Sequence, residues 1–124
     1  MSENPTEPVP SFAVVTVGGT TVMTLHGEID LETSVPLMSR LDARTAGPCP
    51  DLVLDLRPVS FIDCAGLSVL CRALNRVRAR HGRLRLVTDS GRFRRILRAA
   101  GLGEVFELEA QLPEPLAPKP AAAV

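Results

Sequence analysis

The stretch DLVLDLRPVSFIDCAGLSVL, residues 51–70, decides the predicted fold. Its first six residues alternate, so that the three leucines point to one side of a strand and Val53 to the other. Pro58 stops this strand, and a helix begins near Asp63. The predicted helix spans residues 65–81 and carries apolar residues at helical spacing: Leu67, Leu70, Cys71, Leu74 and Val77.

A second alternating strand follows at residues 83–88, after Gly82, which we expect to cap the helix. Residues 51–88 therefore form a right-handed β-α-β unit, in which the two strands are parallel and the helix covers them. Ligands and partners of such sheets meet the loops at the carboxyl ends of the parallel strands. The loop at residues 57–64 lies at such an end.

Two strands and a helix precede this unit. Residues 12–17 and 21–29 are rich in β-branched residues, and Gly18-Gly19 between them predicts an antiparallel hairpin. A helix is expected within residues 30–47, with Pro36 in its first turn. Its predicted apolar face consists of Val35, Met38 and Leu41.

After the unit, a helix at residues 91–101 and a last strand at residues 104–108 are expected. The apolar face of this helix is predicted at Phe93, Ile96, Leu97 and Ala100. The fold class is therefore α/β, with one mixed sheet of about four to five strands and helices packed on it.

The chain of 124 residues is expected to form one domain. Proline-rich ends predict flexible tails at residues 1–10 and 110–124, so the folded unit is predicted at residues 11–109. Apolar runs stay well below the roughly 20 residues of a membrane span, and the N-terminus lacks the pattern of a secretory signal. We therefore expect a cytoplasmic protein.

The cysteines and the charges narrow the function classes. Three cysteines without C-x-x-C spacing argue against a disulfide framework and against a zinc site, so we expect reduced thiols. Residues 72–98 hold ten arginines against one acidic residue, Asp89, although the whole chain has a formal net charge of zero. Such arginines solvate a helix face, bind an acidic protein or bind nucleic acid.

The junction between the first strand of the unit and its helix is the candidate functional site. Asp63 is suited to cap the helix, and the free N–H groups of the first turn favour an anion there. Gly66 lowers helix propensity by about 1 kcal/mol relative to alanine, which indicates that something approaches the backbone closely.

Three segments carry a resemblance to a known family: LHGEIDLETSVPL (25–37), LVLDLRPVSFIDCAGLSVL (52–70) and GRLRLVTDSGRFRRILRAAGLGEVFEL (82–108). Together they resemble the STAS domain of bacterial anti-sigma factor antagonists. The resemblance implies a small non-enzymatic protein without catalytic residues, metal or cofactor. Such proteins bind an anti-sigma factor, often a serine kinase, and so free a sigma factor; phosphorylation by that kinase breaks the complex.

The resemblance also implies where the partner binds. The phospho-acceptor of the family is the hydroxyl residue after the aspartate of the motif, and here Cys64 occupies that position. Neither Cys64 nor the following Ala65 has a hydroxyl, so phosphorylation is not expected there. The implied partner-binding residues are Asp30, Asp63, Cys64, Ala65, Gly66 and Leu67.

Several interpretations of these residues stay open. Cys64 could fill a buried or half-buried site, act as a redox-active thiol at a helix N-terminus, or contact the partner without titrating. A nucleophilic role for Cys64 needs a base, and His81 lies about 25 Å away along the same helix at 1.5 Å per residue. His26, at the end of a strand, is the other candidate base, although a single strand histidine is more often structural or exposed. Asp30 and Asp63 could be an acid–base pair, but helix capping alone would explain both.

Two alternative functions remain at this stage. The first is a scaffold or signalling-complex subunit that binds other STAS proteins. The second is nucleic-acid binding through the arginines, of which Arg72, Arg76 and Arg80 share one helix face.

Overall fold

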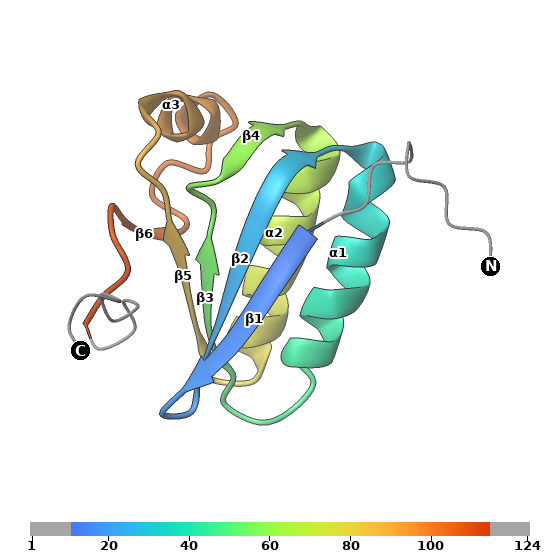
Figure 1. The fold of residues 1–124 in the computed structure, drawn as a ribbon, viewed down its shortest axis with the longest axis vertical. Coiled ribbons are helices and arrows are strands. Elements are labelled where there is room, and N and C mark those ends of the chain that lie inside the picture. The colour runs from blue at the N-terminus through green and yellow to red at the C-terminus, as the bar shows by residue number, and fades with distance from the viewer. Residues whose placement is uncertain (1–10, 115–124) are drawn as a thin grey trace, which may run out of the picture.

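The computed structural model describes residues 11–114, and Figure 1 shows the arrangement of its helices and strands. The predicted tail at residues 1–10 and residues 115–124 of the second tail lie outside the described residues. The strands are β1 Ser11–Val17, β2 Thr20–Ile29, β3 Asp51–Asp55, β4 Val59–Ile62, β5 Arg83–Val87 and β6 Glu107–Glu109. The helices are α1 Leu31–Arg44, α2 Cys64–Ala79 and α3 Gly91–Ala99.

The strands form one mixed sheet in the order β1-β2-β3-β5-β6, and β4 pairs with β2 beyond the end of β3. Only β1 and β2 are antiparallel, joined by Gly18 and Gly19, both of which have positive φ. The β3-α2-β5 unit is parallel, as predicted, with Leu52 opposite Leu84. The α/β fold class and the mixed sheet are thus confirmed.

The sheet has six strands in the described residues, whereas the sequence predicted about four to five. The missed strand is β4, which lies within the predicted loop at residues 57–64. Pro58 ends β3 as expected, but the chain then turns and pairs with the last residues of β2. A four-residue strand directly after a proline gives almost no periodic signal.

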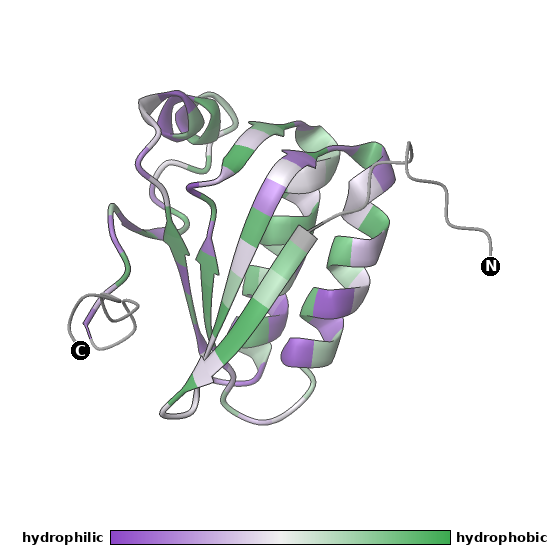
Figure 2. Cartoon of the chain, viewed as in Figure 1, coloured by the Kyte–Doolittle hydropathy of each residue, from purple (hydrophilic) through white to green (hydrophobic). Residues whose placement is uncertain are grey.

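One sheet face carries the main hydrophobic core, and α1 and α2 lie side by side on it (Figure 1). Met23, Leu54 and Leu86 from three neighbouring strands are completely buried there. The opposite face has a smaller cluster of Val22, Val53 and Val87, against which Leu112 packs. The central strands are therefore buried on both faces, and Figure 2 shows hydrophobic positions in each of them together with hydrophilic ones.

Two predicted helix faces need correction. In α1 the buried residues are Ser34, Leu37 and Leu41, whereas Val35 is exposed. Ser34 can be buried because its hydroxyl donates a hydrogen bond to the carbonyl of Leu31, and hydropathy alone does not predict this. In α3, Phe93 and Leu97 are buried as predicted, but Ala100 is the exposed C-cap.

Candidate functional site

The N-termini of α1 and α2 meet at the carboxyl ends of β2 and β4 (Figure 1). Asp30 caps α1, since its carboxylate accepts hydrogen bonds of 3.0 Å from the N–H groups of Glu32 and Thr33. The hydroxyl of Thr33 in turn accepts from the N–H of Asp30, which completes a capping box. The backbone hydrogen bond from Thr33 is the main cause of a lowered Asp30 pKa.

Asp63 caps α2 in the same way, because its carboxylate accepts a 3.0 Å hydrogen bond from the N–H of Gly66. Its own N–H donates to the carbonyl of Ile29, which ties the start of α2 to the end of β2. A Cβ at Gly66 would lie 2.8 Å from that carbonyl oxygen and 2.6 Å from the side chain of Ile62. The close approach inferred at Gly66 is therefore made by the chain itself.

The six residues of the predicted partner site lie at this junction but differ in exposure. Cys64 is exposed, and Asp30, Asp63 and Ala65 are half-buried. This exposure contradicts the interpretation of Cys64 as a filler of a buried or half-buried site. Gly66 and Leu67 are buried, so they hold α2 in place and offer little surface.

Exposed apolar side chains flank the junction on α1. Leu31 is 74% exposed and Val35 is 60% exposed, one helical turn apart. Leu31 also lines a shallow depression together with Asp30, Glu32 and Asp63. Leu31 was not among the residues predicted from the sequence. Its signal is an apolar residue directly after the aspartate that caps the helix.

The structure gives His81, Asp30 and Asp63 positions and roles other than those of a nucleophilic or acid–base site with Cys64. His81 lies beyond the C-terminal end of α2, at the opposite end of the helix from Cys64. Asp30 and Asp63 each serve as a helix cap, as predicted. In residues 11–114, no group of three or more histidine, cysteine or acidic side chains could hold a metal ion. No helix in this range has the length and apolar character needed to cross a membrane.

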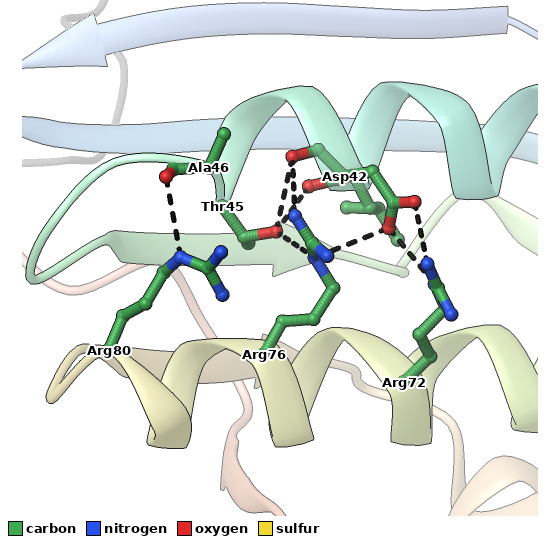
Figure 3. Close-up of polar contacts among 7 residues, drawn as sticks. Asp42, Thr45, Ala46, Arg72, Arg76 and Arg80 are labelled. Atoms are coloured by element: carbon green, nitrogen blue, oxygen red, sulfur yellow. Dashed lines mark hydrogen bonds and ion pairs between the residues drawn. The ribbon is translucent and has the colours of Figure 1, made fainter.

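Three arginines of α2 hold the end of α1 (Figure 3). Arg72 forms a two-pronged hydrogen bond with the carboxylate of Asp42, at 3.1 and 2.9 Å. Arg76 donates to the hydroxyl of buried Thr45 and to the carbonyl of Asp42, and Arg80 donates to the carbonyl of Ala46. These contacts correct the expectation of a merely solvated helix face, because the three arginines bind groups of the chain itself.

The comparisons with known proteins agree with this fold. The STAS domain model matches residues 11–115. A curated relative, the anti-sigma-F factor antagonist RsfA of Mycobacterium tuberculosis, is 34% identical over 84 residues. This match covers 65% of the chain and 65% of the relative, so the chain spans slightly less than two thirds of the relative's length.

Solved structures extend the similarity. The crystal structure of an anti-sigma factor antagonist from Mycobacterium paratuberculosis superposes with a TM-score of 0.75 at 29% identity, and the match covers 84% of this chain and 88% of that one. The Bacillus cell fate determinant SpoIIAA in its phosphorylated form gives a TM-score of 0.63 at 21% identity, covering 82% and 93%. The second likeness concerns the fold alone.

Proposed function

The chain belongs to the STAS domain family, and from this premise we propose that it is an anti-sigma factor antagonist. It acts by binding an anti-sigma factor, which then releases a sigma factor for transcription. The protein performs this role without catalysing a reaction, and its place of action is the cytoplasm, where sigma factors meet RNA polymerase. The main support is the similarity to the mycobacterial antagonists.

The proposed docking surface is the junction of the α1 and α2 N-termini. The carboxylates of Asp30 and Asp63 form its polar part, Cys64 and Ala65 add small side chains, and Gly66 and Leu67 act through the position of α2. The apolar part comes from α1, where Leu31 and Val35 stay exposed. Apolar anchors surrounded by polar groups are the usual composition of a protein interface.

A binding assay tests the proposal. The full chain is titrated against each purified anti-sigma factor of the organism that encodes it, by isothermal calorimetry. One of these factors is expected to bind, and Leu31→Ala is expected to weaken this binding about fivefold or more, because an exposed apolar anchor is lost. Val15→Ala is the matched control, since Val15 is 57% exposed on β1 and lies outside the proposed surface.

Two results would contradict the proposed function. One is the absence of binding to every anti-sigma factor tested. The other is a large assembly of the purified chain with other STAS proteins and no anti-sigma partner, which would favour the scaffold function.

The position of Cys64 leads to a proposal about regulation. Because the thiol stands where the family has its phospho-acceptor hydroxyl, the protein escapes inactivation by serine phosphorylation. The protein is then always able to bind the anti-sigma factor, or its binding is controlled by its abundance or by oxidation of Cys64, whose side chain is exposed.

Phosphorylation is tested with a serine-kinase anti-sigma factor and ATP, followed by mass spectrometry of the peptide containing residues 60–68. The wild-type chain is expected to carry no phosphate there, and Cys64→Ser is expected to gain one because it restores a hydroxyl. Cys64→Ala is the control without a hydroxyl or a thiol. Phosphate in wild-type residues 60–68, where Ser60 and Ser68 are also exposed, would overturn this proposal.

A further inference from the structure

A second site adjoins the junction, between β4 and α3. A small pocket of about 60 Å³ opens there, which exceeds the roughly 10–15 Å³ that a single water needs. Buried Leu56, Ile62 and Phe93 line it, together with the ring of Phe61, which is 44% exposed. The strand β4, which carries Phe61 and Ile62 of this pocket, leads directly into Asp63 of the proposed docking surface.

The polar groups of the pocket are hydrogen-bond donors. The oxygen of Thr88 accepts a hydrogen bond from the N–H of Ser90, and the oxygen of Ser90 accepts one from the N–H of Phe93, both at 3.1 Å. Within residues 11–114 neither hydroxyl donates; Thr88 is buried, whereas half-buried Ser90 can offer its proton to an acceptor from outside. The guanidinium of Arg92 stands at the same pocket, and no acidic residue lines it.

In residues 11–114 five arginines have acidic partners, whereas the arginines of α3, like Arg40, Arg44, Arg78 and Arg80, have none. Arg57, Arg72, Arg76, Arg83 and Arg85 form ion pairs. In the described part of the chain, the four arginines of α3 form none. Arg94 and Arg98 share a groove with Glu104 on another side of α3, whereas Arg92 and Arg95 are exposed, three residues apart. Figure 2 shows hydrophilic and hydrophobic positions next to one another along this helix.

We propose that the pocket between β4 and α3, which Arg92 lines, binds an acidic segment of the protein partner. An apolar side chain of that segment enters beside Phe61, and a neighbouring carboxylate pairs with Arg92 and accepts from the hydroxyl of Ser90. This inference rests on the proposed function, because the partner is the anti-sigma factor. A protein segment fits better than nucleic acid, since a phosphate backbone has no aliphatic group to fill the pocket.

The test compares single substitutions in the complete chain. Arg92→Glu and Phe61→Ala are each expected to weaken anti-sigma binding about tenfold, because a charge pair or an apolar contact is lost. Arg98→Glu has the same charge change on the same helix but lies away from the pocket, and Val15→Ala removes an exposed apolar side chain elsewhere. Both controls are expected to stay within about threefold of wild type.

A peptide probe tests the pocket without the anti-sigma factor. Isotope-labelled chain is titrated with a synthetic peptide that has one leucine followed by glutamates, and amide shifts are followed by NMR. The shifts are expected at residues 59–62 and 88–96, and they should weaken in Arg92→Glu. Replacing the glutamates of the peptide by glutamine, or its leucine by glycine, should also reduce them.

The outcomes separate this inference from the proposed function. The inference about the pocket would be overturned if Arg92→Glu and Phe61→Ala left the affinity for the anti-sigma factor unchanged, or if the peptide shifted amides away from the pocket. The proposed function would remain intact in both cases. Absence of any anti-sigma binding would overturn the proposed function, and the peptide would then decide about the pocket. Binding of a random DNA duplex that depends on Arg92, without peptide binding, would also overturn the inference.

Discussion

His81 and Gly82 have different roles in the turn that ends α2. The N–H of His81 donates to the carbonyl of Arg78, and the N–H of Gly82 donates to that of Val77, which is the pattern of a Schellman motif. The sequence predicted that Gly82 would cap the helix, but the left-handed residue is His81, with φ of 60°. Gly82 is needed for another reason, because a Cβ there would lie 2.1 Å from the carbonyl oxygen of Pro50.

Paired substitutions at this turn should therefore have opposite effects on stability. His81→Gly is expected to raise the free energy of unfolding by about 0.5–1 kcal/mol, because it removes the strain of a side chain at positive φ. Gly82→Ala is expected to lower it by about 2 kcal/mol or more, since the backbone near Pro50 must move. Urea unfolding of both variants measures the two effects. A free energy of unfolding of Gly82→Ala equal to that of the wild type would refute the close packing of Gly82 against Pro50.

The connection between α1 and α2 explains the spacing of the arginines. The last carbonyls of a helix lack partners within it and carry partial negative charge. Arg76 and Arg80 donate to the carbonyls of Asp42 and Ala46, and Arg72 binds the carboxylate of Asp42. The arginines at four-residue spacing thus bind the C-terminal end of α1 and hold α1 against α2. The N-terminal ends of the same two helices form the proposed docking surface.

Asp42 should give this connection a pH dependence. The hydrogen bond from Arg72 and the charges of Arg72 and Arg76 lower the pKa of Asp42 below its ordinary value of 3.8. Because the unfolded chain takes up this proton more readily, the contribution is complete above that value and is lost as pH falls through the lowered pKa. Asp42→Asn is expected to cost about 0.5–1 kcal/mol at neutral pH, a small amount because the pair is partly exposed.

The measurement is the free energy of unfolding from about pH 6 down to about pH 2. Asp42→Asn should approach the wild type at the acid end, where the wild-type carboxylate is protonated. Glu104→Gln also removes one carboxylate but, in the described residues, no ion pair, so it controls for net charge. A constant difference between wild type and Asp42→Asn over the whole range would contradict the role of Asp42.

At the scale of the whole molecule, the sheet topology assembles the proposed surfaces. The pairing of β4 with the end of β2 brings the start of α2 beside the start of α1. The position of β5 then carries α3 to the same end of the sheet (Figure 1). Three helix N-termini that are far apart in the chain thus share one end of the sheet. Carboxylates lie on the α1 side, and on the α3 side lie arginines that form no ion pair within residues 11–114.

The sequence alone determined the α/β class, the hairpin, the β3-α2-β5 unit and both aspartate caps. These features depend on local signals: alternation, helical spacing, glycine pairs and capping residues. It also located the junction at Asp63 and Cys64, because a cap, a glycine and a resemblance coincide there. A periodic apolar pattern over several turns predicts its helix or strand reliably, since such an element must bury its apolar side.

Only the tertiary structure decided the remaining features. The pairing of β4, the exposure of Cys64 and the contact of Gly66 with Ile29 depend on segments that are distant in the chain. Likewise, Arg72 and Arg92 look equivalent in the sequence, yet one meets a carboxylate of another helix and the other faces a pocket. Local sequence patterns predict which side chains favour burial or an ion pair. The packing of segments that are distant in the chain determines which of these side chains are buried or paired.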